Sequence, residues 1–370
     1  MSVNKVSTVE AIALVLIVVI NRLTISLPQA IIMSCGSAAL LNVIYICIIT
    51  LLFVFLITKL FRRFAGKDII DISEFLGGKF LKNLVGVVLI CYFIFFTFTL
   101  LRDFSEILRI LYFPDVPITY ILAFFIVVCV VANLVGSKSI INSNVLLCFS
   151  IIAGIILVCI FVFPSITIQR IFPILGYGAY QTFVVGLSDI FAFNGLVILY
   201  LMPPMLENKT DFKKISIIST VISGLLLILS IVTLLLPFSF STKIRKITPL
   251  YLLLSNNEFG KYVQHPESIF VFTWIISIMS YLNVACLFLL QIVKKLLKVR
   301  HVKPLIIPIG ILLFLTSLIP QSIMQVRDWW LFAYKYISGP LLFILLPLIL
   351  IFANIKYKKV HKNDYDVLKE

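Results

Sequence analysis

The chain has 370 residues, of which 61% are hydrophobic and 13% are charged, and its formal net charge is +15 at pH 7. Ordinary soluble domains contain about 45–50% apolar and about 25% charged residues, so this composition excludes a soluble globular protein. The charged residues cluster in short stretches between long uncharged runs, which is typical of repeated membrane spans. We interpret the positive charge as an excess of Lys and Arg in cytoplasmic loops, and we do not expect binding to nucleic acid.

Taken in chain order, the apolar runs are each near the length of about 20 residues that a helix needs to cross the hydrocarbon core. Only helices and closed barrels satisfy the backbone there, and the strand-like alternation of a barrel is absent. The sequence therefore predicts an all-α polytopic membrane protein with about ten transmembrane helices. The predicted spans are 9–34, 39–59, 83–108, 117–135, 143–163, 180–202, 215–240, 268–293, 304–320 and 335–355.

The distribution of basic residues predicts the orientation in the membrane. With an even number of spans both termini lie on one side, and with the termini inside, the cytoplasmic segments hold more than twice as many Lys and Arg residues as the outer segments. Positive charge favours the cytoplasmic side, so we predict that both termini are cytoplasmic. No linker rich in Pro, Gly or Ser interrupts the chain, which predicts one transmembrane domain over residues 1–370. The first apolar run lacks a clean cleavage site, and we expect it to remain as a span.

The reactive residue types show no catalytic or metal-binding pattern. The seven cysteines lie in or beside apolar runs without a C-x-x-C pair, and the three histidines are not spaced to share a metal. No P-loop, G-x-S-x-G or H-E-x-x-H motif occurs. We therefore predict neither an enzyme nor a cofactor, and no metal site.

The spans divide into two half-repeats of five, at about 9–163 and 180–355. Many transporter folds are inverted repeats whose binding site lies where corresponding helices are broken. The first helix of each half contains polar or helix-breaking residues, at 21–28 in one half and 191–195 in the other. These two stretches are the candidate unwound segments.

The third helix of each half is longer than a perpendicular span requires. One extends from about 82 to 111 and the other from about 267 to 298, so both are expected to tilt. A connection with helical, amphipathic character precedes each of them, at 66–81 and at 248–266. An inverted repeat would put these connections on opposite faces of the membrane, as the predicted topology does.

Several stretches match motifs of one known family. They are Leu101–Leu108 with Phe113–Ile118, at a helix end and a proline-flanked turn; Phe172–Gly178 and Met202–Leu206, before and after helix six; and Thr248–Tyr251 with Pro266–Trp274, before helix eight. With these motifs the chain resembles the B subunit of bacterial spore germinant receptors, a spore germination permease family within the amino acid–polyamine–cation superfamily. The resemblance implies the LeuT-like fold, a 5+5 inverted repeat.

The resemblance also implies a function and partners. The chain would sense a nutrient germinant, bind a small molecule such as an amino acid at mid-membrane, and trigger germination. Its partners would be an A-type membrane subunit and a C-type lipoprotein subunit in the spore inner membrane. An ion-coupled amino acid or amine transporter is the alternative, because one fold serves both roles. A lipid- or channel-type scaffold is a third hypothesis.

The candidate ligand-binding residues lie at the two breaks and on the long helices. Polar groups at the breaks, with half-helix termini, would bind a zwitterion, and Arg22 in an apolar helix is expected to face a cavity. Gly195 would let the backbone approach the ligand closely. Snorkelling for Arg22, and helix packing for the others, are the alternative interpretations. The candidates are Asn21, Arg22, Thr24, Phe191, Asn194, Gly195, Tyr92, Thr97, Tyr281 and Asn283.

Overall fold

The computed structural model describes residues 5–22, 27–237, 248–255 and 265–367. Within these ranges the chain is helical apart from short connections and one isolated bridge between Val6 and Leu206, so the all-α prediction is confirmed. The longer helices are α1 (Thr8–Ile20), α2 (Leu27–Cys35), α3 (Ala39–Phe61), α4 (Ile69–Tyr112), α5 (Ile118–Val135), α6 (Ser137–Val162), α7 (Phe212–Leu235), α8 (Pro249–Ser255), α9 (Glu267–Leu297), α10 (Lys303–Ser317), α11 (Ile323–Ala333) and α12 (Leu346–Val367). Segments of 3₁₀ or π geometry are η1 (Gly36–Ala38), η2 (Arg62–Phe64), η3 (Phe163–Ser165), η4 (Ile168–Ile171), η5 (Tyr180–Val184), η6 (Val185–Tyr200), η7 (Pro203–Met205), η8 (Lys209–Asp211), η9 (Tyr334–Ser338) and η10 (Leu341–Leu345).

The described ranges contain 8 helical segments that are long and apolar enough to cross a membrane, and the shorter apolar helices α1 and α10 accompany them. All of the predicted apolar runs lie on these helices. The last run, 335–355, is the second part of a segment that already begins at Ile323 and contains α11, η9, η10 and α12. The sequence had placed the first part of that segment in a connection outside the membrane.

Helix α4 consists of two parts that meet at a pair of glycines. Gly77 and Gly78 leave helical geometry, and Gly78 has a φ of 68°, a left-handed value that glycine adopts without steric conflict. The short part before the pair, residues 69–76, occupies the connection that the sequence predicts as helical. The long part, residues 79–112, contains the predicted third span.

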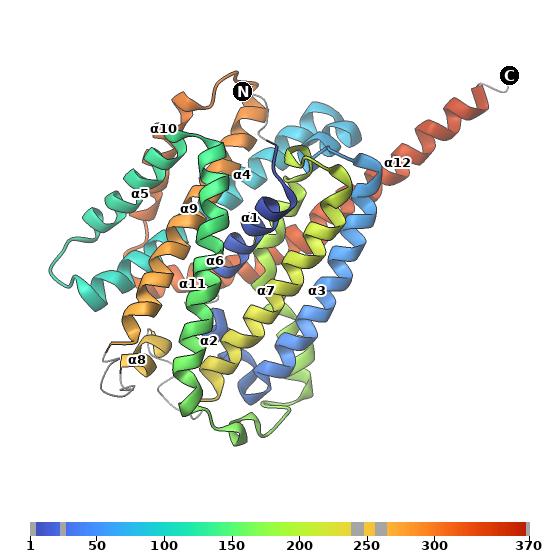
Figure 1. Cartoon of the computed structure of the whole chain (residues 1–370). Helices are drawn as coiled ribbons and strands as arrows, with labels where there is room; N and C mark the ends of the chain where they lie inside the picture. Colours follow the sequence, from blue (N-terminus) through green and yellow to red (C-terminus); the bar gives the residue numbers. More distant parts are fainter. Residues whose placement is uncertain (1–4, 23–26, 238–247, 256–264, 368–370) are drawn as a thin grey trace.

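Helix α1 lies in the middle of the bundle (Figure 1) and packs against α6, α7, α9 and η6. A capping box starts it, in which Ser7 and Glu10 each accept a hydrogen bond from the backbone of the other. All residues from Ala13 to Ile20 are buried. A helix that is apolar on every side can be surrounded by other helices, because it has no polar face that needs water. The C-terminal end of α1 therefore lies in the core of the protein.

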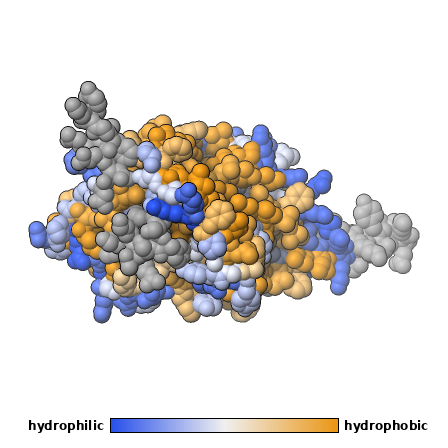
Figure 2. Space-filling model, turned by 90° about the horizontal axis from the view of Figure 1, so that it is seen from below, coloured by the Kyte–Doolittle hydropathy of each residue, from blue (hydrophilic) through white to orange (hydrophobic). Residues whose placement is uncertain are grey.

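The outer helix faces expose large apolar side chains. On α3, Ile48, Leu52 and Phe55 are exposed at a spacing of three to four residues, which puts them on one side of the helix. Comparable side chains, such as Phe124 and Leu146, are exposed on α5 and α6. Figure 2 shows wide hydrophobic areas at one end of the molecule, with hydrophilic residues gathered in separate patches. The exposed apolar side chains on the outer faces of α3, α5 and α6 suit contact with a lipid bilayer.

The segments predicted to be cytoplasmic meet at one end of the molecule. The hydroxyl of Thr8 donates to the carboxylate of Asp211 at 2.8 Å, and Lys295 pairs with Asp68 at 2.6 Å. Lys356 on α12 donates to backbone carbonyls in the short part of α4. Both described ends of the chain lie at this upper end in Figure 1, which we call the basic end. That the basic end faces the cytoplasm stays a prediction.

Candidate functional site

The first predicted break lies between helices α1 and α2. Helix α1 ends at Ile20, and α2 begins at Leu27. Asn21 follows α1 directly, and its side-chain Nδ2 donates to the carbonyl oxygen of Val18 at 2.7 Å. Thr24, one of the candidate binding residues, lies outside the described residues. Helix α1 therefore ends next to the start of the predicted break at 21–28, whereas Leu27 and Pro28 at its end are already helical, and residues 23–26 lie outside the described residues.

The second predicted break is less extensive than expected. The helix η6, of 3₁₀ type, continues from Val185 to Tyr200, and Phe193 alone within it leaves helical geometry, with φ of −97° and ψ of 18°. The structure thus has a kink at one residue in place of an unwound segment over 191–195. The 3₁₀ form satisfies the backbone groups around the kink, so complete unwinding is not required.

The two breaks meet at a small cavity, which we call the central cavity. Its volume of about 10 Å³ is the space that roughly one water molecule needs. Most of the candidate binding residues line it, and they come from segments far apart in the chain. The lining consists of the candidates Asn21, Arg22, Tyr92, Asn194, Gly195 and Tyr281, together with Val18, Phe93, Val197 and Tyr334.

Arg22 is the charged side chain among these lining residues, and it is only 5% exposed. Its guanidinium carbon lies 4.7 Å from the centre of the Trp330 ring and 5.5 Å from that of Tyr334. Its Nη2 donates to Thr99 Oγ1 at 3.5 Å. No ion pair joins it to a carboxylate in the described part of the chain. The aromatic faces stabilise the buried cation. They carry no net negative charge, so the described residues give Arg22 no negative counter-charge.

Two aromatic residues at this site were not among the candidates. Trp330 is a buried residue of α11, and Tyr334 begins η9 one helical turn later. The candidate Phe191 packs against both, with ring centres 6.0 Å from Trp330 and 5.3 Å from Tyr334. Phe191 therefore packs against these aromatic residues and does not itself line the central cavity. The four-residue spacing of the two aromatic residues is a signal for a helix face, but the stretch 321–334 lies between two predicted spans and so contributed no candidate.

The long helices contribute Tyr92 and Tyr281. The hydroxyl of Tyr92 on α4 donates to the backbone carbonyl of Asn194 at 3.1 Å, which ties α4 to η6 beside the kink. Thr97 is buried and interacts with the side chain of Tyr281 on α9, so it supports the lining from behind. Asn283 lies two residues beyond Tyr281, on the other side of α9, and does not line the cavity.

Gly195 lines the cavity, and it also allows η6 to pack closely on α1. A Cβ atom at this position would lie 2.8 Å from the carbonyl carbon of Val18 and 2.8 Å from the backbone nitrogen of Val19. From the sequence, a glycine at this position is expected to let a ligand approach the backbone closely. The structure instead gives the backbone of α1 as the neighbour that excludes a side chain.

Asp189 is buried at a distance from the central cavity. Its carboxylate accepts hydrogen bonds from the hydroxyl of Ser34 at 2.7 Å and from the thiol of Cys35 at 3.5 Å. Both donors belong to the end of α2. This acid therefore links η6 to the helix that follows the first break.

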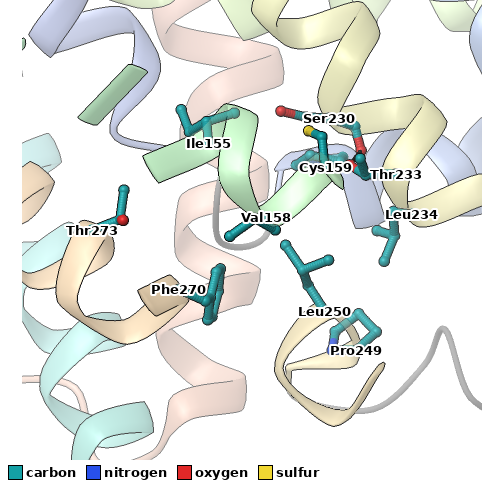
Figure 3. A pocket seen from close by; sticks show the side chains of 11 residues that line it. Ile155, Val158, Cys159, Ser230, Thr233, Leu234, Pro249, Leu250, Phe270 and Thr273 are labelled. Atoms are coloured by element: carbon teal, nitrogen blue, oxygen red, sulfur yellow. Dashed lines mark hydrogen bonds between the residues drawn. The ribbon is translucent and has the colours of Figure 1, made fainter. Parts of the chain in front are cut away.

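A second small cavity lies among α6, α7, α8 and α9, with a volume of about 30 Å³ (Figure 3). Figure 3 shows Val158, Leu250 and Phe270 around its middle. The hydroxyls of Ser230 and Thr273 both donate to the carbonyl oxygen four residues earlier in their own helices, at 2.8 Å. Their polar groups are satisfied locally, so this cavity is a packing gap of apolar character.

Two of the larger cavities at the basic end are lined by several basic residues. One, of about 410 Å³, lies beside α9 and α10, where Asp68 pairs with Lys295. Burial raises the pKa of the Asp68 carboxyl, and the Lys295 ammonium lowers it in part. The other, of about 520 Å³, lies between the end of α3 and residues 203–213. No group of three or more metal-ligating side chains occurs among the residues that the structure describes.

The fold is similar to that of solved transporters with little sequence identity. A Na⁺-coupled sialic acid symporter, in a substrate-bound outward-open state, matches with a TM-score of 0.65 and 12% identity over 90% of this chain and 80% of its own. MhsT in complex with L-phenylalanine matches with a TM-score of 0.67 and 15% identity, over 94% of this chain and 88% of its own. These similarities show the LeuT-like fold.

Sequence comparison identifies the family. The chain is 27% identical to spore germination protein KB of Bacillus subtilis (strain 168) over 200 residues, which are 53% of this chain and 54% of that relative. The matched stretch thus spans about half the length of the relative. The family model described as spore germination protein, or spore permease, matches residues 5–326. With its transporter-like helical fold and this match over most of its length, the chain belongs to the spore permease family of spore germination proteins.

Proposed function

We propose that the chain is the nutrient-sensing membrane subunit of a spore germinant receptor, with the central cavity as its ligand site. The observation that carries this proposal is the placement of Arg22, a buried cation at the meeting point of the two helix breaks. A lone guanidinium costs several kcal/mol to bury unless an anion or a polar network compensates its charge. A ligand with a carboxylate group would supply that compensation.

The lining suits a small amino acid. A planar guanidinium binds a carboxylate through two parallel hydrogen bonds, which fixes the orientation of the ligand. The amide of Asn194 and the backbone carbonyls near Asn21 are acceptors for an ammonium group. The rings of Tyr281 and Tyr334 would contact an apolar side chain. Sialic acid and L-phenylalanine, which the two structural neighbours bind, each carry a carboxylate, in agreement with this choice of ligand class.

Ligand entry requires the central cavity to widen. A volume of about 10 Å³ cannot hold an amino acid. The end of α1 at Ile20 and the kink at Phe193 are points where helix pieces can change direction, so they are the natural hinges. A ligand that binds only the widened form shifts the population toward that form, and this shift would be the signal to a partner subunit.

The partners and location follow from the family. We propose that the chain lies in the spore inner membrane with both termini toward the spore core. There it would assemble with an A-type membrane subunit and a C-type lipoprotein subunit. Deletion of the gene in its spore former should abolish the response to one nutrient. An unchanged response to every nutrient tested would refute the assignment as a sensor.

The ligand can be sought directly with purified protein. A thermal-shift screen of amino acids and sugars should find a stabilising compound that carries a carboxylate. Arg22→Gln should lose that shift, whereas Lys358→Gln, which removes an exposed cation at the basic end, should keep it. Equal shifts in both variants would exclude the central cavity as the binding site.

The second candidate function is ion-coupled transport of an amino acid or amine. The observation that favours it is the similarity in fold to a Na⁺-coupled symporter. Protein reconstituted in liposomes would then concentrate a labelled amino acid when an ion gradient is imposed. A sensor would bind the same compound without accumulation, and its gene would be co-transcribed with genes for A- and C-type subunits.

A further inference from the structure

The larger of the two cavities lined by several basic residues at the basic end has an unusual balance of charge. This cavity, the basic pocket, has a volume of about 520 Å³ and lies between the end of α3 and residues 203–213. Lys59, Arg62, Lys209 and Lys213 line it, and no acidic residue does. None of these four cations forms an ion pair with a carboxylate in the described ranges. The pocket is therefore strongly positive.

The acids closest in sequence do not neutralise these cations. Glu207 and Asp211 line a separate cavity next to the N-terminal segment. There the carboxylate of Asp211 accepts a hydrogen bond from Thr8 at 2.8 Å. The acidic and basic side chains of this short stretch thus belong to different cavities.

Two of the lysines are exposed, and each lies beside a defined neighbour. Lys209 lies across Gly66, where a Cβ atom would be 2.6 Å from Cε and 2.9 Å from Nζ of the lysine. Gly66 also has a φ of 81°. Glycine suits this position because it adopts a positive φ without strain and because it leaves room for the Lys209 side chain. Lys213 Nζ lies 4.9 Å from the ring centre of Phe55.

The pocket continues into an apolar surface on the outside of α3. Phe55 lines it and is 51% exposed, and Leu52, one turn earlier, is 68% exposed. Ile48 extends the same stripe toward the middle of the membrane-spanning helix. Cations at the end of a span next to an exposed apolar stripe match the two parts of a phospholipid, an anionic headgroup and an acyl chain.

We propose that the basic pocket binds the phosphate group of an anionic phospholipid, with an acyl chain lying along the Ile48, Leu52 and Phe55 stripe of α3. Ammonium and guanidinium groups form strong charge-assisted hydrogen bonds with phosphate oxygens. A free phosphate would use the cations and leave the stripe without a partner, which is why a lipid is the better match. This site is separate from the central cavity, so the inference does not depend on the nutrient that the protein senses.

The test uses the full chain in a neutral detergent and counts bound lipid by native mass spectrometry. Phosphatidylglycerol should bind, whereas phosphatidylcholine and inorganic phosphate at equal concentration should not. Each neutralised cation should weaken binding roughly fivefold, so Lys209→Gln with Lys213→Gln should lower the affinity about 25-fold. The matched control, Lys214→Gln with Lys358→Gln, removes two exposed cations at the same end outside the pocket and should bind as wild type.

Three results would overturn the proposal. Equal loss in the test and control variants would mean that net charge, and not the pocket, attracts the lipid. Saturable binding of inorganic phosphate that the test variant loses would mean a soluble anion site. Wild-type binding in the test variant would place the lipid elsewhere. Helical content and melting temperature of each variant, measured in parallel, separate loss of binding from misfolding.

Discussion

The guanidinium of Arg22 lies 4.7 Å from the centre of the Trp330 ring, so the first helix break is joined to a helix near the other end of the chain. A desolvated contact of this type stabilises by about 2 kcal/mol or more. It holds a positive charge at the central cavity without a described carboxylate. The site is thereby prepared for an anionic group that is not part of the protein chain.

Arg22 should govern ligand affinity. Arg22→Gln removes the charge, and the loss of charge-assisted hydrogen bonds should raise the ligand concentration needed by about 10- to 100-fold. Arg22→Lys keeps the charge but loses the planar fork, so it should give an intermediate value. Dose–response midpoints, measured with membrane abundance, check this. Identical midpoints for wild type and Arg22→Gln would contradict the role.

Trp330 should tolerate replacement by another aromatic residue. Its ring nitrogen is buried and has no hydrogen-bond partner among the residues that the structure describes, so Trp330→Phe loses no described hydrogen bond and keeps an aromatic face for Arg22. Trp330→Ala should destabilise by about 3–5 kcal/mol, because it leaves a cavity and an uncovered cation. Melting temperatures of the two variants provide the measurement. Equal destabilisation would show that the indole makes a contact that phenylalanine cannot replace.

Replacement of Gly195 should lower the stability of the folded protein, and any loss of ligand response should follow from that loss of stability. The Cβ atom of Gly195→Ala would press on the backbone of Val18 and Val19, which cannot move as a flexible side chain would. We expect destabilisation of about 1–3 kcal/mol and lower membrane abundance. Gly339→Ala is the control, since its Cβ would meet its nearest atom at 3.6 Å, an ordinary contact. Normal abundance of Gly195→Ala with a blocked ligand response would favour the ligand-approach explanation instead.

Variants at Tyr92 and Asn194 should have different effects, the first on the stability of the protein and the second on the ligand midpoint. Tyr92→Phe removes the hydrogen bond to the Asn194 carbonyl and should cost about 0.5–1.5 kcal/mol of stability. Asn194→Ala keeps that bond, because the backbone accepts it, and should shift the ligand midpoint about tenfold through loss of the side-chain amide. Tyr120→Phe is the control at a ring that is 69% exposed. An unchanged midpoint for Asn194→Ala would remove its side chain from the site.

The orientation can be tested with single cysteines in a cysteine-free background. Asp115, between α4 and α5, and Lys209, at the basic end, are both exposed. If the basic end is cytoplasmic, an impermeant thiol reagent should label Asp115→Cys in intact cells and Lys209→Cys only after permeabilisation. The reverse pattern would invert the topology.

The sequence alone determined the features that depend on neighbours along the chain. The apolar runs follow from the length of a membrane crossing, and the end of α1 next to Asn21 follows from polar residues inside one run. Polar residues within apolar runs also mark Arg22, Tyr92 and Tyr281 as candidates, and all three line the central cavity, whereas their role in ligand binding stays a prediction.

The tertiary structure decided what depends on contacts between distant segments. Trp330 and Tyr334 belong to the site because α11 packs against α4 and η9 packs against η6, and these contacts join segments that are far apart in the chain. Gly195 is explained by the backbone of Val18, and Phe193 kinks without unwinding because the 3₁₀ form keeps its neighbours bonded. Hydrophobicity along a chain fixes which segments are buried, but the partner of each buried group is set by how the helices pack.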